Sequence, residues 1–381
     1  MVKRTKIVIP FNYDESWIGG IYYIKNIISS LNMLEDNVKP YLYILSNEKK
    51  SFDFLVRETG YKYMEHVSSL SFLGYDSNKS RKWKLFQSLI PRFIKSEKNF
   101  DVVFPSPVNS NFRKTICWIP DFQDKHLPEL FSENELEVRT KQHIDYQTNY
   151  DDIVFSSQAA LADFETFYPD AKVATHVVRF ASFNNIENLM SKDSLIEKYN
   201  LPESYVYCPN QFWIHKNHKV VIDAVAKVID SGINVNVVFS GKEHDHRNPN
   251  HVNELKKRVE ILGLSENIHF LGFLPREDQL SLMKNASFIM QPSLFEGWST
   301  VIEDAKVFSK FILASDLPVH SEQLEENYLL FKRDSSEDLA IKMASLIQSP
   351  PKVVDINYSI YQKRFALDFI SMVDTIKRRG N

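Results

Sequence analysis

The chain has 381 residues, which is long enough for two or three domains. Hydrophobic residues make up 43% of it and charged residues 25%, and these globular values exclude disordered, collagenous and coiled-coil proteins. The formal net charge of −3 gives no overall positive field, which excludes a protein whose main partner is nucleic acid.

The first half of the chain alternates short apolar runs with a helical pattern. Lys6–Pro10 indicates a strand, and Gly20–Asn32 indicates a helix with isoleucine and leucine residues along one face. Further short apolar runs are typical of buried parallel strands: Lys39–Leu45, Val102–Phe104, Ile116–Ile119 and Ile153–Phe155.

The same alternation starts again in the second half. The predicted strands are Tyr205–Cys208, Asn234–Phe239, Asn267–Phe270, Ser287–Gln291 and Phe311–Ala314. The predicted helices are His251–Leu262, Arg276–Asn285 and Ser299–Phe308. Such alternation predicts βαβ units with parallel sheets, which is an α/β fold class.

A polar segment without strand character, residues 182–200, divides the two halves. We therefore predict two facing Rossmann-like domains, an N-terminal one over 1–185 and a C-terminal one over 186–355. Aromatic and apolar residues at helical spacing follow between residues 357 and 379. They predict a final helix, within 356–381, that packs back across the domain junction.

Features of the chain favour a cytoplasmic protein. Its two cysteines, Cys117 and Cys208, cannot form a disulfide framework, which suits a reducing compartment. The first apolar run, Ile7–Phe11, is too short for a signal peptide, and no run of about 18 apolar residues could span a bilayer.

The loop Ser293–Trp298 is predicted to follow a parallel strand, at the sheet edge where open α/β sheets bind ligands. Gly297 lets the backbone approach a ligand closely, and Ser299 or Thr300 can cap the next helix, whose free N–H groups suit a phosphate. Glu296 suits hydrogen bonds from sugar hydroxyls. The alternative is an ordinary βα loop with a solvated glutamate.

Residues 292–304 resemble the donor-binding signature of retaining glycosyltransferase family 4, the group 1 type of glycosyltransferase with the GT-B fold. The signature runs P-S-x-x-E-G-F-G-x-x-x-x-E-A; its first Pro, Ser, Glu and Gly match directly, and Trp298 replaces its aromatic residue. The resemblance implies that Glu296 contacts the donor sugar and that a second acid contacts the nucleotide ribose. An ungapped count places that acid on Asp304, with Glu303 one position earlier, and both remain candidates.

Residues 209–218 resemble the second donor motif of this family, in which a Gly-Arg at a strand end and a later Lys hold the donor diphosphate. Lys216 fits the Lys, and Gln211 stands at the position of the Arg. The resemblance implies that Lys216 and the loop amides neutralise the diphosphate, with hydrogen bonds added by Asn217 and His218. The alternative is a basic helix start on the surface.

The acceptor half carries fewer matches. Gly19-Gly20 follow the first strand, as does the family's Gly-Gly turn beside the donor phosphates and the acceptor. Residues 116–131 resemble the V-x-x-H-D-L segment and its continuation, with Asp121 at the Asp and Pro120 at the His. This implies that Asp121 and His126 are the polar groups nearest the reacting centre, where they position the acceptor. The alternative for His126 is a surface loop histidine.

Two further patterns concern metals and membranes. No Asp-x-Asp pair occurs, which favours a donor site without a metal, and His244-Asp245-His246 lies among loop-forming residues. The basic amphipathic stretch over 79–98 suits peripheral contact with an anionic membrane at the inner face. The alternative is a solvated helix whose apolar face enters the N-terminal core.

The sequence therefore predicts a retaining, metal-independent glycosyltransferase without cofactors. It would move a hexosyl or deoxyhexosyl group from a nucleotide-sugar to a glycan or lipid-linked glycan, as in bacterial surface polysaccharide or glycoconjugate synthesis. The missing Arg and His motivate the alternative of a non-catalytic GT-B-like protein that binds a nucleotide-sugar or a partner. A sugar phosphorylase or epimerase on the same fold is a third hypothesis.

Overall fold

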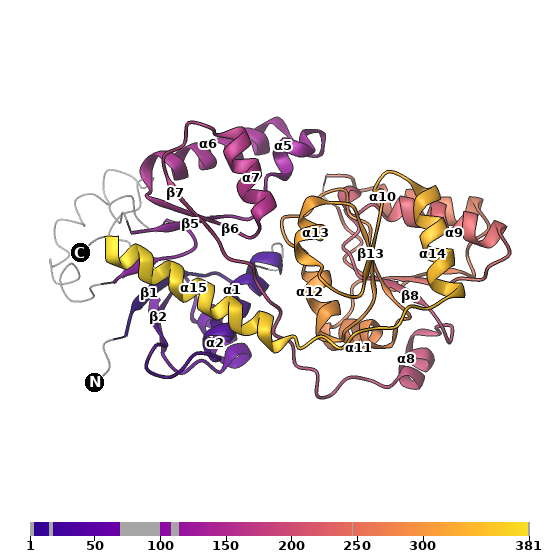
Figure 1. Cartoon of the computed structure of the whole chain (residues 1–381), viewed down its shortest axis with the longest axis horizontal. Helices are drawn as coiled ribbons and strands as arrows, with labels where there is room; N and C mark the ends of the chain where they lie inside the picture. The colour runs from indigo at the N-terminus through magenta and orange to yellow at the C-terminus, as the bar shows by residue number, and fades with distance from the viewer. Residues whose placement is uncertain (1–3, 15–17, 69–99, 108–113, 246, 380–381) are drawn as a thin grey trace.

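The structure is a computed structural model that describes residues 4–14, 18–68, 100–107, 114–245 and 247–379. It consists of two α/β units side by side, with the C-terminal helix lying across the first unit (Figure 1). The basic stretch 79–98, predicted to contact a membrane, lies outside the described residues. Within them, no helix is both long and apolar enough to cross a membrane.

The first unit is built on parallel strands. One sheet has the order β3-β2-β1-β4, and a second has the order β5-β6-β7. An isolated parallel bridge between Val103 and Thr115 connects the two sheets. The strands are β1 Lys6–Pro10, β2 Tyr41–Ser46, β3 Met64–Ser68, β4 Val102–Val103, β5 Ile116–Ile119, β6 Asp152–Phe155 and β7 Ala174–Val177.

Helices cover these sheets, and their positions follow from local sequence. The bounds are α1 Ile18–Leu31, α2 Lys49–Thr59, α5 Gln123–His126, the 3₁₀ turn η3 Pro128–Leu130, α6 Glu133–Asn149 and α7 Gln158–Phe167. The predicted apolar face of α1 is buried in the core. Helix α7 begins at Gln158, because the Ser157 side chain caps it by accepting from the Ala160 N–H at 3.0 Å.

The second unit has one parallel sheet in the order β10-β9-β8-β11-β12-β13. Its strands are β8 Val206–Cys208, β9 Val237–Phe239, β10 Ile268–Phe270, β11 Ile289–Gln291, β12 Ile312–Ser315 and β13 Tyr328–Phe331. Its helices are α8 Lys192–Tyr199, the 3₁₀ turn η4 Ile214–Lys216, α9 His218–Asp230, α10 His251–Ile261, α11 Arg276–Asn285, α12 Thr300–Val307, α13 Pro318–Gln323 and α14 Ser336–Gln348. Both units reverse their strand order beside their first strand, and ligands bind at such a reversal.

The last helix, α15 Ser359–Arg379, returns to the first unit and packs on α1 (Figure 1). Its apolar residues belong to the same core as those of α1 and β1. Phe369, for example, meets Phe104 edge to face, with 5.2 Å between the ring centroids.

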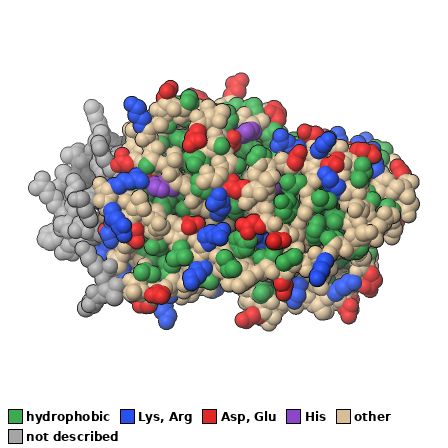
Figure 2. Space-filling view, in the orientation of Figure 1, with side chains coloured by type: hydrophobic (Ala, Val, Ile, Leu, Met, Phe, Trp, Pro, Cys, Tyr) green, Lys and Arg blue, Asp and Glu red, His purple; other side chains and the backbone are tan. Residues whose placement is uncertain are grey.

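On the outside of the molecule, acidic and basic side chains intermingle over the visible face, in line with the small net charge (Figure 2).

Candidate donor and acceptor sites

The candidate donor site lies where the strand order of the second unit reverses, between β8 and β11. Lys216 stands on η4, which follows β8, and Glu296 stands on the loop that follows β11. Lys216 Nζ donates to Glu296 Oε1 at 2.5 Å. The reversal thus brings together the two residues that the sequence motifs single out, although 80 positions separate them.

Glu296 is a buried, well-paired carboxylate. Besides Lys216, its Oε1 accepts from the Gln291 amide and the Ser293 hydroxyl, both at 2.7 Å. Burial opposes ionisation of Glu296, but the charge and hydrogen bond of Lys216 together hold its pKa below the usual value. Glu296 is therefore ionised at neutral pH and acts as a hydrogen-bond acceptor.

Two hydrogen bonds, one between backbone groups and one from a side chain, fix the Lys216 turn to the Glu296 loop. The Leu294 N–H donates to the His215 carbonyl at 2.7 Å. Asn217 adopts a left-handed backbone with φ 56°, and its side-chain amide donates to the Pro292 carbonyl at 3.2 Å. These links hold the cation and the carboxylate in one rigid arrangement.

Three further residues belong to the site, although the motifs give them no role: Asn210, Gln291 and His320. Gln291 is the polar end of an otherwise apolar strand, and its Oε1 accepts from the Asn210 amide at 3.0 Å. Fully buried His320 contributes to the electrostatic environment of Glu296, and burial lowers the pKa of its imidazole. The signal that could have revealed Gln291 is a buried polar residue at the carboxyl end of a strand.

The other donor-motif residues are placed as follows. Gln211 is half-buried in the turn after β8, near Lys216 in sequence, and its side chain makes no hydrogen bond within the described residues. Ser299 is the N-cap of α12, and Thr300 is the first residue of that helix. The Ser299 N–H donates to Gln323 Oε1 at 3.1 Å, so this amide already has a partner.

His218 does not supply the hydrogen bonds expected of it. Its ring is fully buried, stacked on Phe212 with 4.5 Å between centroids and edge-on to Phe239. It faces the core because it lies one turn before Val221 and Ile222 on the buried side of α9. Burial, aided by the charges of His251 and Lys216, lowers the pKa of His218 to about 3.

This histidine should make the protein sensitive to acid. His218 takes up a proton near pH 6.5 in the unfolded chain but only near pH 3 in the folded chain. The contribution of this residue to the free energy of unfolding is therefore fully present above pH 6.5 and is lost as the pH falls toward 3. We expect His218 to lower the free energy of unfolding by about 3 kcal/mol between pH 7 and pH 4. Urea unfolding of His218→Phe should show a correspondingly weaker pH dependence, whereas His244→Phe, at an exposed position, should follow the wild type.

Glu303 and Asp304, the two candidates for the second acid, are both buried but face different partners. Asp304 accepts from Arg276 Nη2 at 2.5 Å and from the Asn184 amide at 2.8 Å. Glu303 lies at the junction between the two units and accepts from Tyr358 Oη at 2.6 Å. They diverge because neighbouring helical positions point about 100° apart.

A cavity of about 410 Å³ lies at the strand reversal of the first unit, beside the ends of β1, β4 and β5. Gly20 and Asp121 line this cavity, and exposed Gly19 precedes Gly20 at the start of α1. Asp121 Oδ1 accepts from the Gln123 N–H at 3.0 Å, and Arg139 lies 3.7 Å away. The lining combines apolar side chains, among them Trp118, with charged ones such as Asp121 and Arg139.

His126 lies outside the lining of this cavity, between α7 and the Glu296 loop. Its Nε2 contacts Asp163 Oδ1 at 2.8 Å, and its ring lies 5.1 Å from that of Phe295.

The loop of Glu296 also reaches the first unit at Gly297. A methyl group added there would overlap the Pro120 carbonyl oxygen and lie 2.9 Å from Asp121 Cβ. The Glu296 loop, Ser293–Trp298, which is the candidate donor loop, therefore directly contacts the segment of Pro120 and Asp121, the candidate acceptor segment.

The described residues contain no group of three or more potential metal ligands among His, Cys, Asp and Glu. His246, part of the His-Asp-His segment, lies outside the described residues.

Comparison with known proteins identifies the second unit. Residues 191–363 match the family model described as glycosyl transferases group 1. No match was found among curated protein sequences.

The whole chain is similar to the structure of Anabaena Alr3699/HepE in complex with UDP and glucose, with a TM-score of 0.66 and 18% identity over 99% of this chain and 98% of that one. It is also similar to a glycosyltransferase from Rickettsia africae, with a TM-score of 0.60 and 15% identity over 99% and 97%. WaaG, a glycosyltransferase involved in lipopolysaccharide biosynthesis, gives a TM-score of 0.56 and 12% identity over 98% of each chain. Residues 191–363 are therefore a glycosyltransferase group 1 domain, and the chain is a glycosyltransferase with the GT-B fold.

Proposed function

We propose that this protein is a retaining, metal-independent glycosyltransferase that moves a sugar from a nucleotide-sugar to a glycan or lipid-linked glycan in the cytoplasm. The observation that carries the proposal is the buried Lys216–Glu296 pair at one strand reversal, with its loop in contact with the acceptor segment of the other unit. A cation for a diphosphate and a carboxylate for sugar hydroxyls are thus adjacent, next to an acceptor cavity.

The proposed reaction begins with departure of the nucleoside diphosphate from the anomeric carbon, which gains oxocarbenium character. Lys216 stabilises the leaving diphosphate together with the amides near Gly297–Thr300, except that of Ser299, which already donates to Gln323. Such an electrostatic contribution usually dominates this kind of catalysis. Glu296 orients the sugar hydroxyls, and Asp121, which lines the cavity of the first unit, positions the acceptor. His126, to which the resemblance gives the same role, lies outside that lining and pairs with Asp163. The acceptor hydroxyl attacks the face that the diphosphate leaves, and the departing phosphate takes its proton.

Asp304 is our choice for the ribose-binding acid. It is in register with the family signature. Its partners are the long side chain of Arg276 and the side-chain amide of Asn184, and both can move aside for a ribose diol. Glu303, by contrast, accepts hydrogen bonds from three side chains at the junction.

UDP-glucose is the first donor to test, because the similar Anabaena protein has been crystallised with UDP-glucose. The similarity to WaaG supports an acceptor from bacterial surface polysaccharide synthesis. The decisive experiment incubates the protein with UDP-glucose and a panel of glycan and lipid-linked acceptors, and determines the anomeric configuration of the product by NMR. An α-linked product supports retention, and a β-linked product contradicts it. Binding of UDP-glucose with no turnover would favour the non-catalytic alternative.

Nucleotide-sugar binding should be undiminished in EDTA. The sequence has no Asp-x-Asp pair, and Lys216 with the helix amides supplies positive potential for the diphosphate. Calorimetric titration with UDP-glucose in EDTA and in Mg²⁺ should give the same dissociation constant. A strict requirement for a divalent ion at the binding step would contradict the metal-free site.

A further inference from the structure

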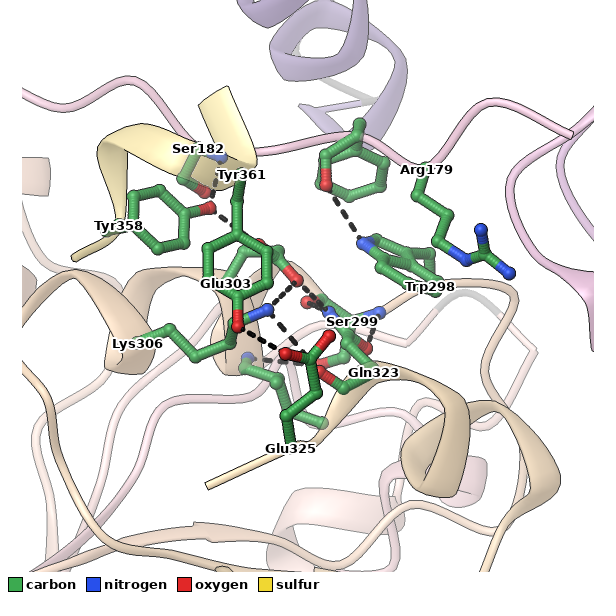
Figure 3. Close-up of polar contacts among 12 residues, drawn as sticks. Arg179, Ser182, Trp298, Ser299, Glu303, Lys306, Gln323, Glu325, Tyr358 and Tyr361 are labelled. Atoms are coloured by element: carbon green, nitrogen blue, oxygen red, sulfur yellow. Dashed lines mark hydrogen bonds and ion pairs between the residues drawn. The ribbon is translucent and has the colours of Figure 1, made fainter. Parts of the chain in front are cut away.

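A polar cluster at the junction of the two units connects the last helix to the donor domain. We call it the junction cluster, and its members are Ser182, Glu303, Lys306, Gln323 and Tyr358. These residues come from the linker between the units, from α12, from the end of α13 and from the residue before α15. Figure 3 shows the side chains of Lys306, Gln323 and Tyr358 around Glu303, with Ser182 beside Tyr358.

Tyr358 joins three separate segments through its one hydroxyl group. The hydroxyl donates to Glu303 Oε2 at 2.6 Å and accepts from the Ser182 N–H at 2.7 Å. Gln362, on the first turn of α15, donates to the Ser182 carbonyl at 2.9 Å. The linker, α15 and α12 are therefore held in one arrangement, and the Tyr358 hydroxyl is the link between them.

Glu303 has other partners besides Tyr358. Glu303 Oε1 also accepts from the Gln323 amide at 2.8 Å and from Lys306 Nζ at 3.3 Å. Lys306 in turn lies over the Tyr361 ring, 3.8 Å from its centroid. Removing only the Tyr358 hydroxyl would leave this buried carboxylate paired, so the fold should survive the change.

The junction cluster continues to the loop of Glu296. Gln323 holds both backbone groups of Ser299: its Oε1 accepts from the N–H at 3.1 Å, and its amide donates to the carbonyl at 2.7 Å. The neighbouring Trp298 donates from Nε1 to the Phe180 carbonyl in the linker at 3.1 Å. Ser299 lies three residues after Glu296, so the junction fixes one end of the donor loop.

We propose that Tyr358 is a positioning residue, whose hydroxyl couples the relative placement of the two units to the donor loop through Glu303 and Gln323. The kinetic part of this inference rests on the proposed function. Tyr361 provides a matched control, because its ring stacks on that of Tyr358 while its own hydroxyl donates to exposed Glu325 at 2.8 Å.

The first test measures the distance between the units and needs no substrate. Both natural cysteines are buried, so spin labels can be attached at Lys141→Cys in the first unit and Ile261→Cys in the second, both at exposed positions. We expect Tyr358→Phe to broaden the distance distribution measured by pulsed electron resonance, with a longer mean, and Tyr361→Phe to match the wild type. Identical distributions for wild type and Tyr358→Phe, or equal shifts in both variants, would overturn the proposal.

The second test uses UDP and UDP-glucose as probes in the unlabelled full chain. We expect Tyr358→Phe to lower kcat about tenfold, as for loss of a hydrogen bond to a charged group, with UDP affinity unchanged. Equal losses of kcat and UDP affinity, or a wild-type kcat, would overturn it. If the wild type turns over none of a panel of nucleotide-sugars while the distance shift is still seen, the coupling stands and the proposed function fails.

Discussion

Lys216→Ala is expected to weaken binding of UDP by about 1.5–3 kcal/mol, the contribution of a charged hydrogen bond, or about 10- to 150-fold in the dissociation constant. Lys216 is the cation placed at the strand reversal, where a diphosphate would lie. Binding of uridine should change far less, because uridine has no phosphate. Calorimetry with both ligands tests this, and equal losses of UDP and uridine affinity would show that Lys216 does not contact the phosphates.

The same substitution should also destabilise the fold, because it leaves Glu296 buried without its cation. The Glu296 side chain is only 9% exposed, and loss of one partner of a buried pair costs about 3–5 kcal/mol. The hydrogen bonds from Ser293 and Gln291 place our expectation at the lower end. Lys216→Ala combined with Glu296→Gln should regain most of the stability and none of the UDP affinity. If the double variant regained UDP affinity, the effect of Lys216 would lie in folding and not in binding.

Gly297→Ala is expected to lower kcat about 100-fold, because a displacement near 1 Å at a reacting centre has an effect of this size. The added methyl group would overlap the Pro120 carbonyl oxygen and crowd Asp121 Cβ. Neither group is the end of a flexible side chain, so the donor loop and the acceptor segment must move apart. UDP affinity should stay close to that of the wild type, because Lys216 belongs to the second unit alone.

Gly263→Ala is the control for this substitution. Gly263 has a φ of 67°, where alanine is strained, but a methyl group there would meet no heavy atom within 4 Å. This variant should lose about 1 kcal/mol of stability and keep the wild-type kcat. Initial rates with UDP-glucose and thermal unfolding distinguish the two effects. A kcat for Gly297→Ala within twofold of the wild type would show that the close approach is not part of the reactive arrangement.

The predicted strands lie mostly inside the sheets, and those that were missed lie at their edges. Strands β1 and β11, buried on both faces, were predicted from apolar runs alone. Strands β3, β7 and β13 were not predicted, and each has mostly half-exposed residues at the end of a sheet. The hydrophobic pattern of a sequence indicates which residues are buried. An edge strand, which pairs with only one neighbouring strand and is half-exposed, therefore has a weak pattern.

The candidate site divides in a similar way. Glu296 and Lys216 could be found because each stands at a fixed place after a strand, and the fold class alone brings such places together. The Tyr358–Glu303 contact could not be found, because it depends on how α15 returns to the first unit. The burial of His218 was predictable from its spacing to Val221 and Ile222. The resemblance of residues 209–218 to a donor motif instead predicted that His218 donates a hydrogen bond to the diphosphate.

The return of α15 to the first unit has a consequence for the order of folding on the ribosome. The core of the first unit includes Phe365, Phe369 and other residues of α15, which are made after the whole second unit. At about 5–20 residues per second, the ribosome needs about 10–40 s to travel from the linker to the end of α15. During that time the second unit can complete its own core, while the helix α1 has apolar surface that awaits its partner. The second unit, although later in sequence, is therefore the first that can finish folding during synthesis.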